Sequence, residues 1–181
     1  VSPSQLNEKW FSNRKSPDLT KIKLLYVGRI RTEKGIFSLL KILKEIKLDF
    51  TITIINPEKF YDEKLENEKV KIVNFKKDHE SLMEVYDDHN VFILPSYTEG
   101  HPQALDESLS RLRPVIIFPE ISHVTRNREG IFISERNSES LSNKIKFIMN
   151  NHKDIQKKMM SNKFPTKKSF LNEMTRIIGQ G

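Results

Sequence analysis

The sequence predicts an α/β fold, a doubly wound Rossmann-like parallel sheet of about six strands with helices on both faces. Two observations support this class. Short apolar runs recur along the chain, and such runs form strands that are buried on both faces of a sheet. Segments with the apolar spacing of helices separate most of these runs, as parallel crossovers require.

The apolar runs give the expected strands. They are rich in β-branched and aromatic residues, and glycine, proline or asparagine bounds several of them. In chain order the predicted strands are Lys23–Val27, Phe50–Ile55, Val70–Phe75, Val91–Leu94, Val115–Phe118 and Gly130–Ser134.

The intervening segments give the expected helices. Each places apolar residues three and four positions apart, so that one face of the helix can pack on the sheet. The predicted helices are Gly35–Ile46, His79–Asp88, Pro102–Leu112 and Ser138–Asn150, with a further helical turn near Tyr61–Leu65.

The two ends of the chain do not fit the predicted sheet. Residues 1–20 are polar apart from Trp10 and Phe11, and we interpret them as a linker. Pro165 interrupts the helical pattern, and Ser169–Ile178 resumes it with an apolar face that needs a partner surface. We therefore expect a Rossmann-like domain over residues 21–163 and a C-terminal helix within residues 164–181.

Composition excludes several classes of function. A chain of 181 residues, 36% hydrophobic and 30% charged, is long enough for one globular domain with a substantial core. The absence of cysteine excludes disulfides, thiolate chemistry and cysteine-based zinc sites. No apolar stretch approaches the roughly 20 residues that a membrane span needs. We expect a cytoplasmic protein.

The positive charge lies toward the C-terminus. From residue 144 onward there are nine Lys or Arg and two Asp or Glu, and their difference equals the net charge of +7. A solvated helix face explains such a run, and contact with a membrane or a lipid diphosphate is the alternative. Nucleic acid is not expected, because no aromatic residues interleave the basic ones. The basic residues include Lys153, Lys157, Lys158, Lys163, Lys167 and Lys168.

A glycine-bounded loop follows the first predicted strand. Gly28 lets the chain turn off the strand, and Gly35 opens the next helix. Arg29 and Lys34 bracket this loop at the carboxyl edge of the sheet, where open α/β sheets bind ligands. A fork of arginine donors and a lysine point charge suit a diphosphate, whereas an ordinary loop with solvated charges is the alternative.

Two glutamates flank the loop and helix after the fourth strand. Glu99 lies in a loop at the end of the strand, where functional side chains concentrate. Glu107 lies in the helix, off the stripe of Leu105, Leu109 and Leu112. Its carboxylate can reach the crevice and accept hydrogen bonds from sugar hydroxyls. An exposed glutamate in the middle of a helix is the alternative.

The residues between the glutamates predict an anion site. Gly100 permits a ligand to approach the backbone, and Pro102 suits the first helical position. Backbone N–H groups near His101 and Gln103 then point outward at the positive end of the helix dipole.

These segments together resemble the C-terminal, nucleotide-sugar-binding domain of group 1 (family 4) retaining glycosyltransferases of the GT-B fold. In that family a Gly-Arg-…-Lys-Gly loop follows the first strand, a Pro-Ser-…-Glu-Gly-…-Glu segment follows the fourth, and Arg-Pro-Val-Ile follows the helix. The resemblance extends over roughly residues 23–150. The matching residues are Gly28-Arg29, Lys34-Gly35, Pro95-Ser96, Glu99-Gly100, Glu107 and Arg113-Pro114-Val115-Ile116.

The resemblance implies a role for each matched residue. Arg29 and Lys34 would hold the diphosphate of the donor and neutralise the leaving group. Glu99 would contact the donor sugar near the reacting carbon, and Glu107 would accept hydrogen bonds from the ribose. The resemblance implies no cofactor and no metal in the site. The catalytic candidates are thus Glu99, Arg29 and Lys34, and the donor-binding candidates are Gly28, Gly100, His101, Pro102, Gln103 and Glu107.

The resemblance further implies a longer, two-domain enzyme of polysaccharide biosynthesis. Residues 1–20 would lead from an N-terminal domain that binds a glycan or lipid-linked acceptor, and residues 164–181 would return to it. The predicted reaction transfers a hexosyl group from a nucleoside-diphosphate sugar with retention. The isolated chain would be inactive. The enzyme would be cytoplasmic, with its basic helices as a peripheral contact at the inner face of the membrane.

Other functions stay open at this point. One is another GT-B reaction, such as nucleotide-sugar epimerisation or phosphorolysis. The other is a non-catalytic α/β module that binds an anionic surface or a protein through its basic helices. The sequence departs from the family at Asn56-Pro57, at His101 and at Pro119–Ser122, where the family has a Gly-Gly turn near the donor sugar, so it does not predict which sugar binds.

Overall fold

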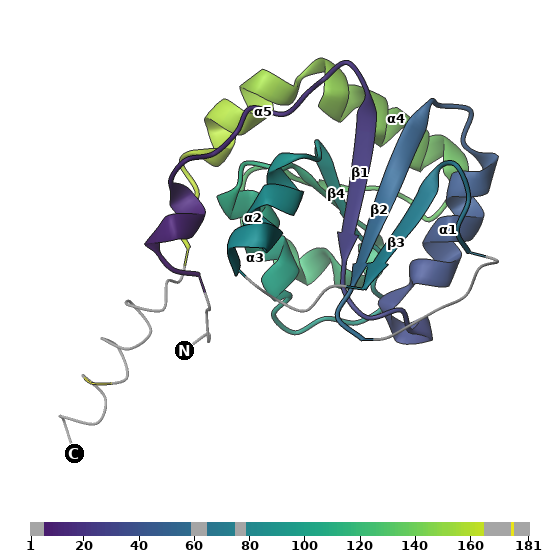
Figure 1. Cartoon of the computed structure of the whole chain (residues 1–181), viewed down its shortest axis with the longest axis horizontal. Coiled ribbons are helices and arrows are strands. Elements are labelled where there is room, and N and C mark those ends of the chain that lie inside the picture. The colour runs from purple at the N-terminus through teal and green to yellow at the C-terminus, as the bar shows by residue number, and fades with distance from the viewer. Residues whose placement is uncertain (1–5, 59–64, 75–78, 165–174, 176–181) are drawn as a thin grey trace.

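The computed structural model describes residues 6–58, 65–74, 79–164 and Thr175, within the whole chain drawn in Figure 1. In this part of the chain six strands form one parallel sheet in the order β3-β2-β1-β4-β5-β6. The predicted doubly wound α/β class is therefore confirmed. The strands are β1 (Ile22–Val27), β2 (Phe50–Asn56), β3 (Val70–Asn74), β4 (Val91–Leu94), β5 (Val115–Ile117) and β6 (Ile131–Ile133).

Helices cover both faces of the sheet, as predicted. Helices α2 and α3 lie on one face and α1 and α4 on the other (Figure 1). The chain leaves β1 toward β2 but leaves β4 toward β5, in opposite directions, so right-handed crossovers place the helices on opposite faces. The helices are α1 (Ile36–Glu45), α2 (His79–Asp87), α3 (Gln103–Ser110), α4 (Ser138–Asn150) and α5 (His152–Met159), with 3₁₀ turns η1 (Glu8–Phe11), η2 (Thr32–Lys34) and η3 (Pro119–Thr125).

The two central strands carry the core. All four residues of β4 are buried, as is the second half of β1, because helices cover both faces there. Val27 pairs with Ile55 and Leu94 with Ile117, so all these strands end at one edge. The arrowheads in Figure 1 point to that edge, which lies at the bottom of the view. Loops that leave this edge therefore meet in space although their sequences are far apart.

Some helix ends differ from the prediction. The helix expected over Pro102–Leu112 ends at Ser110, and Leu112 has a left-handed backbone with φ of 56°. The helix expected over Ser138–Asn150 is α4, with the same bounds, and a separate helix, α5, follows it after Asn151. The helical turn near Tyr61–Leu65 and the helix Ser169–Ile178 lie outside the described residues, except for Leu65 and Thr175.

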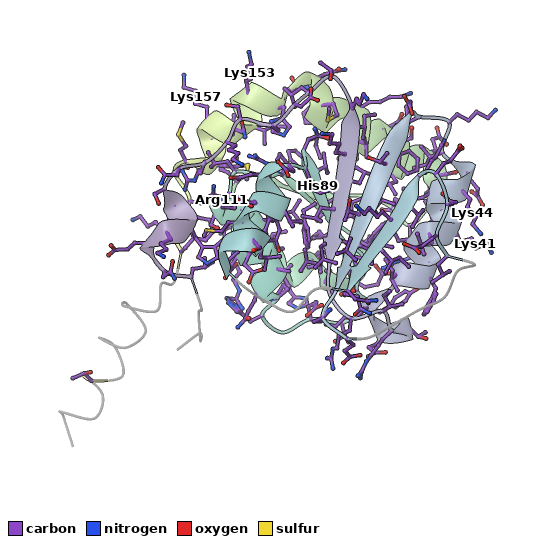
Figure 2. The ribbon with its side chains drawn as sticks, in the orientation of Figure 1. Lys41, Lys44, His89, Arg111, Lys153 and Lys157 are labelled. Atoms are coloured by element: carbon purple, nitrogen blue, oxygen red, sulfur yellow. The ribbon has the colours of Figure 1, made fainter. Side chains whose placement is uncertain are left out.

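The segment before β1 packs on the domain. Trp10 is 1% exposed and meets the ring of Tyr86. The Arg111 guanidinium, which lies between η1 and α2 in Figure 2, donates to the carbonyl oxygens of Trp10 and Ser12 at 3.1 and 2.8 Å. Residues 6–20 thus lie against the sheet-and-helix body. Their role as a linker to another domain stays a prediction.

The basic residues of α5 face solvent. Lys153 and Lys157 extend away from the body of the molecule in Figure 2. Within the described residues, no helix combines the length and apolar character needed to cross a membrane.

Candidate functional site

A cavity of about 370 Å³ opens at the carboxyl edge of the sheet. Its walls come from the ends of β1, β2 and β4, from the loops after β1 and β4, and from α2 and α3. Such a volume falls in the range of small-molecule sites. Eight of the nine predicted site residues line this cavity, and Gly100 does not. The eight are Gly28, Arg29, Lys34, Glu99, His101, Pro102, Gln103 and Glu107.

 Gly100 itself is exposed at the rim, between two residues of the wall.

Position 28 needs a glycine, because the Tyr26 side chain fills the space that a Cβ would occupy. A Cβ at position 28 would lie 2.6 Å from the Tyr26 hydroxyl, which donates to the carbonyl oxygen of Arg29 at 2.8 Å. The Gly28 amide donates to Ile55 on the neighbouring strand at 2.9 Å. Burial is the main reason why the pKa of Tyr26 is raised, so its hydroxyl stays protonated and keeps the loop in place.

Gly35, which follows Lys34, lets the loop after β1 approach the backbone of the loop after β4 closely. It ends η2 and begins α1 with a left-handed φ of 68°, and a Cβ there would lie 1.9 Å from the Pro95 carbonyl oxygen. Only glycine meets both conditions without strain. The loop after β1 therefore packs directly on the loop after β4.

Lys34 and Glu99 meet across these two loops. The Lys34 Nζ atom lies 2.7 Å from Glu99 Oε1, and the Ser96 hydroxyl donates to the same oxygen at 2.7 Å. Both ionic side chains are mostly buried, with 23% and 11% of their surface exposed. Lys34 and Glu99, which are 65 residues apart in the sequence, thus share one wall of the cavity.

Arg29 occupies a more open position. Its side chain is 45% exposed, and its Nη1 atom lies 4.0 Å from Glu58 Oε1 at the rim of the cavity. Arg31 also pairs with Glu58, at 2.9 Å. Exposed pairs of this kind contribute little to stability, so Arg29 can turn toward a ligand at low cost.

The start of α3 faces the cavity through its backbone. Pro102 precedes the first helical residue, and no side chain caps the N–H groups of the first turn. His101, Pro102, Gln103 and Ala104 all line the cavity. The helix dipole and the amides of the first turn make this end attractive to an anion.

Glu107 is buried. The alternative that it is an exposed glutamate in the middle of a helix is therefore wrong. Glu107 is 5% exposed and accepts a hydrogen bond from the Tyr86 hydroxyl at 2.9 Å. Five other residues of α3 are also buried, because η1 and the sheet pack on this helix and Tyr86 of α2 reaches it. Burial, together with the charge of Glu107, raises the pKa of Tyr86 well above its usual value, so the tyrosine remains the donor.

His101 is held by charged neighbours that the sequence did not indicate. Arg126 Nη1 lies 3.2 Å from His101 Nδ1, and since arginine can only donate, Nδ1 is the acceptor and the proton lies on Nε2. Nε2 is 3.0 Å from Asp106 Oδ2, and Arg128 pairs with the other Asp106 oxygen. The His123 ring also contacts the Glu99 carbonyl oxygen at 2.7 Å. The segment after β5 thus fastens the loop after β4.

Arg136 is a further residue near the site that the sequence did not indicate. Its guanidinium lies between the rings of Tyr97 and Phe118, at 4.2 and 4.3 Å, and pairs with Glu120 at 2.9 Å. It also donates to the Pro95 carbonyl oxygen at 3.1 Å. Arg136 therefore braces the loop that carries Ser96 and Glu99. No local pattern in the sequence indicates this role, because its partners come from two other segments, the loop after β4 and the segment after β5.

The described residues also bear on metal binding. No group of three or more His, Cys, Asp or Glu side chains comes together within residues 6–58, 65–74 and 79–164 in a way that could hold a metal ion. That the site works without a metal or cofactor stays a prediction.

A comparison of the sequence with models of protein families shows the family to which the chain belongs. The family model for glycosyl transferases group 1 matches residues 8–164, which is most of the chain. The chain belongs to the group 1 glycosyl transferases. A comparison with curated protein sequences found no match. The family that the motifs resemble is therefore confirmed.

Solved structures share the fold of this group 1 glycosyl transferase chain. Sucrose-phosphate synthase from Thermosynechococcus elongatus superimposes with a TM-score of 0.74 at 19% identity, over 98% of this chain and 51% of that protein. The C-terminal domain of a glycosyl transferase group 1 family protein (LpcC) from Francisella tularensis gives 0.58 at 18% identity, over 88% of this chain and 90% of that domain. HepE from Anabaena, solved in complex with UDP-glucose, gives 0.60 at 18% identity, over 79% of this chain and 43% of that protein.

At these identities the structural matches establish the fold. This group 1 glycosyl transferase chain spans about half the length of sucrose-phosphate synthase, with 51% of that protein covered. It spans nearly the whole of the Francisella C-terminal domain, with 90% covered.

Proposed function

We propose that this chain binds the nucleoside-diphosphate sugar used by a retaining glycosyltransferase, and that the cavity at the carboxyl edge is the donor site. The observation that carries the proposal is the meeting of Lys34, Glu99 and the uncapped start of α3 on one cavity. A cation and free helix N–H groups suit a pyrophosphate, and carboxylates suit the hydroxyl groups of a sugar. Family membership supplies the class of reaction.

The positive groups act on the leaving nucleoside diphosphate. When the bond between sugar and phosphate breaks, negative charge grows on the phosphate oxygens. Lys34 and the start of α3 are in place before the reaction, so they stabilise this charge without rearranging. Arg29 turns from Glu58 toward the diphosphate when the donor binds. These groups supply positive charge without a metal.

The two glutamates hold the two ends of the donor. Glu107 accepts hydrogen bonds from the ribose, and Glu99 contacts the sugar near the reacting carbon. Both carboxylates line the cavity, and the Lys34 ammonium group, 2.7 Å from Glu99 Oε1, holds that carboxylate in place. His101, Pro102 and Gln103 present backbone to the phosphate or sugar. Gly28 lines the same cavity, and the open space beside Gly100 lets the donor approach the backbone there.

The remaining parts of the proposal concern the longer protein. A further, N-terminal domain binds a glycan or lipid-linked acceptor, and the active site is the cleft between the two domains. The isolated chain consequently transfers no sugar. In the cell the enzyme is cytoplasmic, and the basic residues of α5 contact the inner face of a membrane. Sugar transfer by this chain alone would contradict the statement that the isolated chain is inactive.

The test of the donor site is a thermal-shift and calorimetric screen with UDP, GDP and their sugars. A nucleotide present at about 100 times its Kd should stabilise the chain by roughly 2.7 kcal/mol. Because Arg29 contacts the diphosphate and Glu107 the ribose, Arg29→Ala and Glu107→Ala should each remove most of this shift. Lys157→Ala is the matched control, since Lys157 extends into solvent from α5 (Figure 2).

Several results would count against the proposal. A flat response to every nucleotide excludes a donor site. Release of an epimer or a free monosaccharide by the full-length protein without an acceptor indicates a different reaction. A non-catalytic module is indicated if nucleotides have no effect while charge reversal at Lys157 and Lys158 abolishes binding to anionic vesicles.

A further inference from the structure

Tyr86 lies directly behind Glu107. Tyr86 belongs to α2 and Glu107 to α3, and the tyrosine hydroxyl donates to Glu107 Oε2 at 2.9 Å. Tyr86 is fully buried, whereas Glu107 borders the cavity and keeps 5% exposure. A ligand in the cavity therefore meets Glu107 and not Tyr86.

The Tyr86 ring is itself fixed by its surroundings. The Trp10 ring meets it edge-on, with centroids 6.0 Å apart and planes at 68°. Phe92 packs on it with centroids 5.8 Å apart. Its backbone carbonyl accepts from Arg113 Nε at 3.0 Å. Trp10 comes from the segment before β1, so this segment reaches the back wall of the cavity.

We infer that Tyr86 is a positioning residue that holds the Glu107 carboxylate ready for the ribose hydroxyls of the donor, and that Trp10 supports Tyr86 in this task. The inference rests on the proposed donor site, in which Glu107 is the ribose acceptor. It adds two residues to that site, one of them from the segment before the sheet.

The physical reason is preorganisation. A glutamate side chain has three rotatable bonds, and fixing them when a ligand arrives costs conformational entropy. A hydrogen bond from a buried hydroxyl fixes one carboxylate oxygen beforehand, and burial makes that bond stronger than it would be in water. Without the hydroxyl, Glu107 loses this partner and its orientation toward the ribose.

The test compares ribonucleotides with analogues that lack the ribose hydroxyls. The probes are UDP and GDP, and their 2′,3′-dideoxy counterparts, titrated calorimetrically into the chain. Tyr86→Phe keeps the ring and removes the hydroxyl. It should weaken binding of the ribonucleotide on the order of tenfold, the effect of losing one hydrogen bond to a charged group, and leave the dideoxy analogue unchanged. Trp10→Phe should change the same ratio in the same direction, by less.

Leu141→Ala is the control. Leu141 is fully buried in α4, on the face of the sheet opposite to α2 and α3, so the change removes packing without touching the surroundings of Tyr86. It should lower stability without changing the ratio of the two affinities, because its effect does not pass through the carboxylate. The ratio thus separates positioning from a merely structural role.

Two results would overturn the inference while leaving the donor site intact. One is a Tyr86→Phe variant that binds ribonucleotide as tightly as the wild type. The other is an equal loss for ribo and dideoxy forms in that variant, when Glu107→Gln does show a loss confined to the ribonucleotide. If wild-type protein binds none of the four probes, the donor site and the inference both fail.

Discussion

Gly35 shows how one residue fixes the relation between two loops of the site. Its φ of 68° lies in the left-handed region, and its Cα faces the Pro95 carbonyl oxygen. Because Arg136 also donates to that oxygen, the loop after β4 cannot easily withdraw to make room. Lys34 and Glu99 meet as a result of this close approach.

Gly35→Ala should therefore destabilise the chain by about 2–4 kcal/mol, since it combines backbone strain with a backbone clash. Gly100→Ala is the matched control, because a Cβ at Gly100 would meet nothing within 4 Å. Urea unfolding of both variants measures the difference. Equal stabilities for the two variants would show that the loops are not packed as described.

At the scale of elements, α5 is docked by a buried histidine. His152 is 1% exposed, and its Nε2 lies 3.0 Å from the carbonyl oxygen of Asn90, which precedes β4. Burial lowers the pKa of His152, so the folded chain favours the neutral ring. Burial also lowers the pKa of His89, between α2 and β4.

These two histidines predict how stability depends on pH. The unfolded chain takes up protons below a pH of about 6.5 and the folded chain does not until lower pH, so the free energy of unfolding should fall as pH decreases from about 6.5. His152→Gln keeps a donor for Asn90 but cannot titrate, and should make this fall shallower. The further variant His89→Gln should flatten it again. The same slope in the wild type and the double variant would refute this assignment. Unfolding curves from pH 5 to 8 measure the slope.

Helices and strands could be predicted from the sequence where the local pattern of apolar residues determines them. Val91–Leu94 is uniformly apolar and forms a strand buried on both faces, and Ile36 to Glu45 forms the helix that its spacing predicts. The surroundings of α3 were not predictable in this way. Its own pattern allowed Glu107 to be exposed, but η1, the sheet and Tyr86 of α2 enclose it. The same holds for the bond between Tyr86 and Glu107, because no local rule joins residues 21 positions apart.

At the scale of the whole molecule, the basic residues of α5 lie apart from the cavity. The cavity lies at the carboxyl edge of the sheet, whereas Lys153 and Lys157 extend from α5 at the opposite end of the view in Figure 2. Strand order alone brings the loops after β1 and β4 together, because these strands are neighbours in the sheet. The family motifs indicated both loops, but the sequence did not show the segments after β5 and β6 that hold them.

This separation predicts independent effects. Charge reversal in the double variant Lys153→Glu and Lys157→Glu should reduce binding to vesicles that contain anionic lipid, because each lysine near a membrane contributes about 1 kcal/mol. It should leave nucleotide affinity within twofold of the wild type, since the charges lie far from the cavity and salt screens them. Sedimentation with vesicles and calorimetry with UDP or GDP measure the two effects. A parallel loss of both would place nucleotide binding on the basic helices.

A crystal structure of the chain with UDP or GDP tests the central claim most directly. The account predicts the pyrophosphate within hydrogen-bonding distance of Lys34 and the first amides of α3, with the ribose hydroxyls on Glu107. A nucleotide bound elsewhere on the chain, with Lys34 and Glu107 not in contact with it, would contradict the account.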